Sequence, residues 1–543
     1  MKYKIELVLI GIILLFASYI RLNDIRNYQV FLGDQGRDVL TVKRMIVDRD
    51  MTFLGPTASV GGFFLGPFYY YLMVIPLALS GLDPVGPAVM VALFSIATTY
   101  MAYSFGRRYF SVETGLIAAA LYSISRLVVE YARSSWNPNV LPFFSFLLVY
   151  IFAILIENKS RHKKLILFAI GSCLGILIQL HYAVMGMYIL SAVAYCIYVW
   201  KDSIEQHMLN VTKRIKEMAI MGLGMGLFFG PFLAFEIYHS FPNFTNIVRF
   251  IFTNRGGGFS GGYTYEFIIR DTIYRLFLRL VAGGNDILAV VTISITVVGL
   301  IIAAYLFISR FYLYGKAKGK EGSFNEDLQS YFYIILSKPM GIGYILMVLW
   351  LICGVAPWGF YKKAIYDYYY SYMYVLPIML LAISLGLLLH LKNKQTKVVG
   401  SIASLCLLIA LIATNYKSLQ QVFPGMQVQR AQWVAEAILK RKTDGPYNFA
   451  LITPGNSDHA YRYFLEIWGH APVPLEEQVT NQLIVFCEPD VEPCEPEGNS
   501  LWEVAGFGPS SIVGQWEVIG LPLYRLEHGE QSKQMEGKPA KKG

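Results

Sequence analysis

The sequence has few charged side chains for its length. Of its 543 residues, 15% are Asp, Glu, Lys or Arg and 55% are hydrophobic, and the mean hydropathy is +0.46. Soluble domains carry roughly 25% charged residues, so this chain has too few to cover a water-facing surface of its size. Its apolar residues come in blocks separated by short charged loops, as in helices that cross a bilayer. The composition therefore excludes a soluble globular protein.

Acidic residues are fewer than basic ones, and the net charge is +9. An excess of positive charge can indicate nucleic-acid binding, but much of the Lys and Arg here falls in loops between apolar blocks. Basic loops of that kind mark the cytoplasmic side of a membrane protein. We therefore expect the bilayer as a partner and no nucleic acid.

A cleavage site is missing after the first apolar block, at residues 5–20. Residues 21–24 supply no small residue for a signal peptidase, so we interpret the block as a retained first span. Cysteine is scarce as well, and four of the six lie in apolar blocks, where packing is its usual role. Cys487 and Cys494 lie in the polar tail and could form a disulfide if the tail is outside the cytoplasm.

The distribution of basic loops predicts about eleven membrane spans, with the N-terminus in the cytoplasm and the C-terminus outside it. The predicted spans are residues 5–21, 85–106, 113–132, 140–156, 165–181, 183–200, 218–238, 287–308, 341–357, 373–389 and 398–415. Residues 63–82 are also apolar, but counting them would put Arg107 and Arg108 outside. We therefore interpret residues 69–82 as a helix at the outer membrane interface, with an ordinary span as the alternative.

Composition divides the chain into three parts. Residues 1–415 predict an all-α polytopic transmembrane domain with large outer loops at 21–83 and 239–286. Residues 416–530 predict a small α/β domain outside the cytoplasm, and residues 531–543 a disordered polar end. Within the tail, the hydrophobic patterns predict helices at 430–442 and 457–468 and strands at 447–453 and 482–487.

The first outer loop contains two carboxylates in residues 33–38 (GDQGRD), followed by an apolar pattern of helical period. Asp34 stands where the helix would begin, so capping the helix N-terminus is one role for it. Asp38 follows four residues later and would share a helix face with Asp34. Two converging carboxylates can also hold a divalent cation or act as a general base. The residues alone leave these roles open.

Two further segments place polar and aromatic residues at a membrane boundary. Arg133 could clamp a phosphate beside Trp136 and Asn137, or it could only extend to lipid headgroups. Trp136 could stack on a sugar or seat at the interface. The polar run 179–182, which includes His181, ends a span. It suits the lining of a polar cavity, and hydrogen bonding between helices is the alternative.

Basic residues in the predicted outer loops are candidates for binding an anionic lipid head. Arg255 lies in the Gly-rich part of residues 239–286, which could close over such a head. That part lacks the strand-turn-helix context of a nucleotide-binding loop. Lys362 and Lys363 break the positive-inside pattern, so they favour a functional role. An aromatic belt explains most of the tyrosines at 366–370 beside them.

Taken in order, these features resemble the GT-C glycosyltransferases, and among them the protein O-mannosyltransferase and aminoarabinose transferase group. The first loop of that family typically reads Asp-Glu-x-Arg-Tyr-Ala, and residues 34–39 here read DQGRDV. Its His-Pro-Pro-Leu-Tyr-Tyr segment corresponds to residues 65–70, LGPFYY. The resemblance covers the layout of most of the membrane part, and motifs only in the first two outer loops.

The resemblance implies a plasma-membrane glycosyltransferase that transfers a sugar from a polyprenyl-phosphate donor to a hydroxyl of a protein, lipid or glycan. Asp34 would be the base, with Asp38 as a second carboxylate, or Asp34 would bind a divalent metal such as Mg or Mn. A single displacement would invert the anomeric centre. Gln35 replaces the Glu of the family, and Leu65-Gly66 replaces its charged or His residues, so the phosphate needs a cation from elsewhere. The candidates for binding donor phosphate or sugar are Arg37, Arg133, Trp136, Asn137, His181, Arg255, Lys362 and Lys363.

Two other functions stay open. A transporter or flippase of lipid-linked sugars would also have polar residues in its spans, but no inverted halves are visible in the sequence. The acidic loop and the tail domain also lie on one predicted side, which suits an enzyme better than alternating access. A ligase or polymerase of surface polysaccharide would differ mainly in its acceptor.

Overall fold

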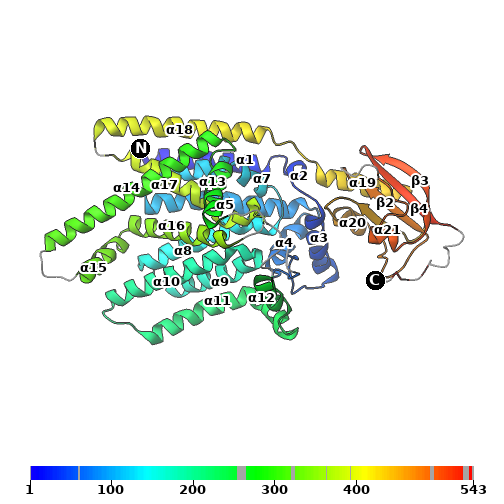
Figure 1. Ribbon diagram of the computed structural model, residues 1–543, viewed down its shortest axis with the longest axis horizontal. Coiled ribbons are helices and arrows are strands. Elements are labelled where there is room, and N and C mark those ends of the chain that lie inside the picture. Colours follow the sequence, from blue (N-terminus) through cyan, green and yellow to red (C-terminus); the bar gives the residue numbers. More distant parts are fainter. Residues whose placement is uncertain are drawn as a thin grey trace.

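The computed structural model describes residues 2–58, 62–253, 264–318, 324–361, 364–391, 393–489, 494–529, 537, 539 and 540. The molecule is long, with a bundle of helices at one end and a small sheet domain at the other (Figure 1). The expected fold class, an all-α membrane protein with a small α/β C-terminal domain, is confirmed.

Nine helical stretches among the described residues are long and apolar enough to cross a bilayer. Their helices are α1 (Lys2–Leu22), α5 (Val85–Tyr109), α8 (Leu141–Glu157), α9 (Lys163–Leu180), α10 (Met185–Glu205), α11 (Val211–Tyr238), α14 (Asp286–Lys318), α16 (Pro339–Val355) and α18 (Lys394–Gln420). Three of these helices are extended by short 3₁₀ segments. These segments are η2 (Asn137–Val140) before α8, η3 (Tyr182–Val184) before α10 and η4 (Ala356–Phe360) after α16.

Two further apolar helix pairs are bent. The helix α6 (Val112–Ile124) meets α7 (Arg126–Ala132) at 61°, and η5 (Asp367–Met373) meets α17 (Val375–Leu389) at 52°. If each pair is one span, the described residues contain up to eleven, at the places that the sequence predicted. The side of the membrane on which each terminus lies stays a prediction.

The helix α4 (Phe68–Leu79) occupies the apolar stretch that the sequence analysis did not count as a span. Its 12 residues extend about 18 Å at 1.5 Å per residue, which is short of the roughly 30 Å of a hydrocarbon core. It packs against α5 and against α3 (Gly33–Lys43) in the first outer loop. This length agrees with a helix that does not cross the membrane.

The packing of α9 against α11 depends on small residues. A Cβ atom at Gly171 would lie 1.8 Å from the carbonyl oxygen of Met221, and one at Gly224 would lie 2.2 Å from that of Phe168. Helices approach this closely only where side chains are absent, a common way for membrane helices to associate. The C-terminal end of α9 also lies next to the first predicted outer loop, because a Cβ atom at Gly66 would lie 2.3 Å from Gln179 Cγ.

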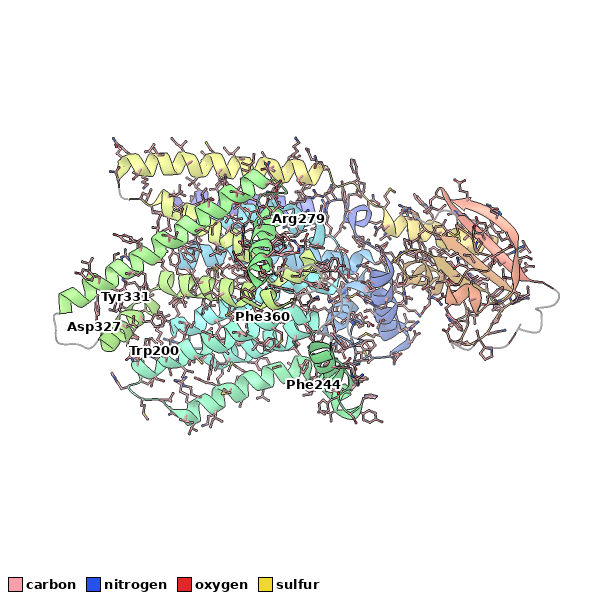
Figure 2. The ribbon with its side chains drawn as sticks, viewed as in Figure 1. Trp200, Phe244, Arg279, Asp327, Tyr331 and Phe360 are labelled. Atoms are coloured by element: carbon pink, nitrogen blue, oxygen red, sulfur yellow. A yellow bond between two sulfur atoms is a disulfide. The ribbon has the colours of Figure 1, made fainter. Side chains whose placement is uncertain are left out.

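The sequence analysis missed two helices in residues 239–286, which it treated as a loop. They are α12 (Pro242–Thr253), whose Phe244 lies at the outer edge of the bundle (Figure 2), and α13 (Tyr265–Leu280). The glycine-rich residues between these two helices are typical of a loop, whereas the residues on either side have helical hydrophobic spacing. The remaining helix of the membrane part, α15 (Phe324–Leu336), packs against α14 and α16.

The C-terminal domain is a four-stranded mixed sheet in the order β1-β2-β4-β3 with three helices. Its elements are α19 (Gln427–Arg441), β1 (Asn448–Ile452), α20 (His459–Ile467), β2 (Gln482–Cys487), α21 (Trp502–Ala505), β3 (Ser510–Val518) and β4 (Leu521–His528). The strands β1 and β2 are parallel, and β4 runs antiparallel to both of its neighbours. Both predicted helices and both predicted strands are present, but the hairpin β3–β4 was missed.

Cys487 and Cys494 form a disulfide. Most of the predicted disordered end lies outside the described residues.

Candidate active site

The helix α3 presents Asp34 at its first turn. The Oε1 atom of Gln35 accepts the backbone N–H of Leu32 at 3.1 Å, so Gln35 holds the start of the helix. The Asp34 side chain is left 52% exposed. A negative side chain in the first turn is favoured by the helix dipole. The capping role considered for Asp34 therefore belongs to Gln35, and about half of the Asp34 side chain is open to solvent.

Arg37 joins the two carboxylates of the motif. Its Nη1 atom lies 2.9 Å from Asp34 Oδ1, and its Nη2 atom lies 2.8 Å from Asp38 Oδ1. The Tyr70 hydroxyl, on α4, donates to the same Asp38 oxygen at 3.1 Å. Asp38 is fully buried behind Arg37, and among the described residues its Oδ2 atom has no partner. Asp38 therefore contacts Arg37 and Tyr70 and does not line cavity 1, and its catalytic role stays a prediction.

Burial raises the pKa of Asp38 to about 6, and the charge of Arg37 opposes the rise. Above that pH the carboxylate is ionised and pairs with the guanidinium. Below it, the proton removes the charged partner that fixes the Arg37 side chain. The charge state of this buried group is thus coupled to the geometry at Asp34.

Two glycines of the same motif face the C-terminal domain. A Cβ atom at Gly36 would lie 2.3 Å from the backbone nitrogen of Ala460, and one at Gly33 would lie 2.1 Å from Ser457 Oγ. The helices α3 and α20 therefore touch backbone to backbone, as their neighbouring positions in Figure 1 show. The motif has one face for this contact and another for the charged side chains.

A cavity of about 230 Å³, here called cavity 1, lies beside Asp34 and Arg37. Its walls come from the first outer loop, η2, the segment after α9 and the tyrosine-rich η5. Arg37 is the only Arg or Lys among the described residues that line it. The aromatic lining residues are Phe63, Trp136, Tyr182, Trp358, Tyr361, Tyr368 and Tyr369.

The tyrosine-rich segment is fixed to α13 by charge pairs. Arg275 Nη2 lies 2.6 Å from Asp367 Oδ1, and Arg279, labelled in Figure 2, places Nε 3.6 Å from Asp367 Oδ2. The ring of Tyr368 then lies 4.5 Å from that of Trp136, centroid to centroid. These contacts give cavity 1 a rigid aromatic wall, which is a surface on which a sugar ring can pack.

His181 lines cavity 1 as a neutral imidazole. Its Nδ1 atom accepts the backbone N–H of Ala183 at 3.0 Å, which places the ring proton on Nε2. Burial lowers the pKa of His181 to about 4. It can donate a hydrogen bond but cannot supply a positive charge near neutral pH. The alternative of helix–helix hydrogen bonding applies instead to its neighbour Gln179, whose Nε2 donates to Phe228 O on α11 at 2.9 Å.

A second and larger cavity of about 700 Å³, here called cavity 2, lies between the membrane part and the C-terminal domain. Asp34 and Trp136 line both cavities. Asp34 therefore stands where the two spaces meet, and a group in either one can approach its carboxylate.

The other predicted site residues have different positions. Arg133 does not line cavity 1, because its guanidinium donates to Ile20 O and lies 4.2 Å above the ring of Tyr28. Asn137 lines cavity 1, but its Nδ2 atom donates to Leu180 O at 2.6 Å and ties η2 to the end of α9. The remaining three candidates, Arg255, Lys362 and Lys363, lie outside the described residues.

The sequence analysis missed Tyr70 as a partner of Asp38 and assigned Tyr368 and Tyr369 to an aromatic belt. The sequence feature that could have indicated this wall of the cavity is the density of tyrosine, since residues 366–370 include four tyrosines. A belt needs only occasional aromatic residues, so such a cluster beside two lysines indicates a binding surface. Nothing in the sequence pairs Tyr70 with Asp38, which are 32 residues apart.

The carboxylates do not make a typical divalent-cation site. Asp34 Oδ1 faces a guanidinium, and Asp38 is enclosed behind it. In the part of the chain that the structure describes, no group of three or more His, Cys, Asp or Glu converges. Hard cations need several oxygen ligands, and a fixed Arg competes for the ones here. The arrangement suits a base and a cation better than a metal ligand set.

Comparison with known proteins identifies the fold. A family model described as dolichyl-phosphate-mannose-protein mannosyltransferase matches residues 65–216. ArnT from Cupriavidus metallidurans in the apo state matches with a TM-score of 0.54 at 12% identity, over 99% of this chain and 100% of that chain. The chain has the GT-C fold. The resemblance noted from the sequence is thereby confirmed.

Two further structures share the GT-C fold. ArnT from the same organism bound to undecaprenyl phosphate has a TM-score of 0.53 at 12% identity, over 98% of this chain and 99% of that one. The archaeal oligosaccharyltransferase AglB from Archaeoglobus fulgidus, in complex with an inhibitory peptide and a dolichol-phosphate, has a TM-score of 0.51 at 12% identity. The match covers 89% of this chain and 70% of that one. No curated protein sequence matches the chain. At such identities the likeness establishes the fold, and the activity of this GT-C chain must be argued from its site.

Proposed function

We propose that this GT-C chain is a membrane glycosyltransferase that moves a sugar from a polyprenyl-phosphate donor to an acceptor hydroxyl. The observation that carries the proposal is the pair of Asp34 and Arg37, 2.9 Å apart, on the wall of an aromatic cavity. The carboxylate supplies a base and the guanidinium a fixed cation for a phosphate. The family match and the ArnT structure with undecaprenyl phosphate support a donor of this class.

The donor head occupies cavity 1. A space of about 230 Å³ is below the roughly 300–1,000 Å³ that drug-sized ligands take, so it suits a sugar phosphate while the polyprenyl chain stays in the membrane. Arg37 uses its Nε, Nη1 and Nη2 atoms once each on Asp34 and Asp38. A guanidinium has five N–H groups, so two remain to bind a phosphate.

The reaction is a single displacement. The Asp34 carboxylate takes the proton of the acceptor hydroxyl, whose oxygen attacks the anomeric carbon of the donor sugar. The bond between that carbon and the phosphate oxygen breaks, and polyprenyl phosphate leaves with the bonding electron pair. Arg37 stabilises the charge that develops on the departing phosphate. Attack opposite the leaving group inverts the anomeric centre.

Lys362 and Lys363 remain proposed phosphate ligands, because they directly follow Tyr361, which lines cavity 1. Arg255 is proposed on its charge in a predicted outer loop alone. We place the site on the outer face of the plasma membrane, with the N-terminus in the cytoplasm and the C-terminal domain outside, from the distribution of basic loops. No step of the reaction uses a metal ion.

The test uses purified protein in lipid nanodiscs with radiolabelled polyprenyl-phosphate hexoses as donors and a membrane extract as the acceptor source. Release of polyprenyl phosphate and transfer of label are measured for the wild type and for Asp34→Asn. Asp50→Asn, an exposed carboxylate on the same outer loop, is the matched control. We expect transfer by the wild type and by Asp50→Asn, none by Asp34→Asn, and no loss on adding EDTA.

The outcomes separate the proposal from its alternatives. Full transfer by Asp34→Asn with normal insertion would remove Asp34 from the reaction. Loss of transfer in EDTA would replace the base by a metal-bound species. Binding of the donor with no release, for every hexose tried, would support a transporter of lipid-linked sugars instead of an enzyme.

A further inference from the structure

Cavity 2 has the chemistry of a second binding site. Its walls combine the segment between α2 (Ile25–Tyr28) and α3, the end of α7, the linker from α18 to α19, and residues 455–457 of the C-terminal domain. It meets cavity 1 at Asp34 and Trp136. At about 700 Å³ it is within the range of sites that enclose a ligand of several linked rings.

The lining of cavity 2 offers amides, hydroxyls and aromatic rings and few charged groups. Apart from Asp34, the charged residues among the described lining are Glu130 and Arg133. Glu130 Oε1 lies 2.7 Å from Arg126 Nε, and Arg133 is held by Ile20 O and the ring of Tyr28. One positive side chain against two carboxylates gives the described lining a formal charge of −1, which disfavours an anionic ligand and favours an uncharged one.

Gln29 provides a specific contact that the protein itself does not use. Its side chain is 2% exposed and lines cavity 2, and among the described residues its Nε2 atom has no hydrogen-bond partner. Leaving a buried N–H group without a hydrogen-bond partner is energetically unfavourable. An oxygen acceptor on a bound ligand would remove that cost, and a hydroxyl-bearing ligand supplies one.

Phe423 gives the same cavity an aromatic surface at its edge. It lies on the short linker between α18 and α19, is 83% exposed, and lines cavity 2. A large aromatic side chain this exposed gains little from folding, whereas it provides a flat apolar face for a ligand ring. A sugar ring presents such an apolar face together with hydroxyls.

We propose that cavity 2 is the acceptor subsite and that the acceptor is the end of an uncharged glycan. Gln29 Nε2 donates to a hydroxyl oxygen of the glycan, and Phe423 packs against one of its rings. One terminal hydroxyl then reaches Asp34, where it loses its proton and forms the new bond to the donor sugar in cavity 1. This assignment rests on the proposed function for the chemical step, but not for the binding of the acceptor.

Binding is therefore tested directly. Saturation-transfer NMR measures the dissociation constants of neutral trisaccharides, with maltotriose, cellotriose and chitotriose as probes, for the protein in nanodiscs. We expect at least one to bind the wild type, and Gln29→Leu to weaken it by about tenfold, the equivalent of 1.4 kcal/mol. Gln206→Leu, an exposed residue at the end of α10, is the matched control and should leave binding unchanged.

A second variant avoids the risk of misfolding at a buried position. Phe423→Ala changes an exposed side chain, so it should leave the fold intact and still weaken the trisaccharide severalfold. Phe244→Ala, an exposed phenylalanine on α12, is its control. In both cavity-2 variants the dissociation constant of the polyprenyl-phosphate donor should equal that of the wild type, because the donor binds in cavity 1.

Three results would overturn the inference. One is that no neutral trisaccharide binds while a Ser/Thr peptide or a phosphorylated sugar does. Another is that both cavity-2 variants bind the trisaccharide as the wild type does. The third is that either variant weakens the donor as much as the acceptor. Trisaccharide binding that depends on Gln29, without any donor cleavage, would uphold the binding site and refute the proposed reaction.

Discussion

The side-chain oxygen of Asn456 accepts a hydrogen bond from the backbone N–H of Gly33 at 2.8 Å. This contact ties the C-terminal domain to the residue directly before the proposed base. The Nδ2 atom of Asn456 in turn donates to Glu488 Oε1 at 2.7 Å. Glu488 also accepts from Tyr461 at 2.7 Å and from Thr453 at 2.8 Å, so one carboxylate organises the segment that touches α3.

Glu488 should therefore influence the reaction without touching a substrate. We expect Glu488→Ala to lower kcat by about tenfold, which corresponds to 1.4 kcal/mol of lost positioning, with little change in the donor dissociation constant. Glu436→Ala, on the exposed side of α19, is the control. Partial recovery of kcat in Glu488→Gln would support positioning, since the amide oxygen can still accept some of the bonds. Equal losses in donor binding and kcat would contradict it.

Gly36→Ala should loosen the contact between α3 and α20. In an exposed helix interior this change stabilises by roughly 1 kcal/mol, but here the new Cβ would lie 2.3 Å from the backbone of Ala460. We expect faster proteolysis between the membrane part and the C-terminal domain, together with at least tenfold lower transfer. Gly222→Ala on α11, where a Cβ meets nothing within 4 Å, should behave as the wild type. Normal protease resistance and activity in Gly36→Ala would show that the contact is not needed.

Arg37→Lys should cost activity although the charge is kept. A lysine ammonium cannot bridge Asp34 and Asp38 and bind a phosphate in the same plane. We expect kcat to fall roughly a hundredfold, the usual loss when one charge-stabilising donor is removed. Steady-state kinetics with Arg49→Lys, an exposed arginine in the same loop, as control would check this. A normal kcat in Arg37→Lys would move phosphate binding to another cation.

The pH dependence of transfer should report Asp38. Its pKa of about 6 lies above the ordinary value of 3.8, so its contribution to stability is fully present below 3.8 and is lost as the pH rises through 6. Activity changes in the opposite direction, because only the ionised form holds Arg37. We expect kcat/KM of the wild type to fall as the pH drops below about 6. The Asp38→Asn variant should be weakly active, and its kcat/KM should not show this fall at acid pH. His181, with a pKa of about 4, stays neutral over this range. If kcat/KM of Asp38→Asn still fell below about pH 6, the titrating group would be another residue.

The sequence determined the features that depend on neighbouring residues. The eleven apolar stretches, the short α4, the helix carrying Asp34, and the elements α19, β1, α20 and β2 all follow from hydrophobic period and length, which act locally. The hairpin β3–β4 was missed because most of its side chains are partly or fully exposed. Its sequence therefore shows only a weak alternation of apolar and polar residues. The helices of residues 239–286 were missed because glycine-rich composition outweighed the period on each side.

Only the tertiary structure decided where the candidate residues lie relative to one another. Asp38 and Asp34 share a helix and a charge, yet Tyr70 and Arg37 enclose one of them and leave the other open to both cavities. The sequence predicts phosphate binding by Arg133, but the structure shows its guanidinium donating to the carbonyl oxygen of Ile20 and outside the lining of cavity 1. Gln29 and Phe423, nearly 400 residues apart in the chain, line one cavity because α3 and α18 lead into the same domain boundary. Contacts between residues that are distant in the chain depend on how the helices and the sheet pack together. The local hydrophobic pattern of the sequence does not predict them.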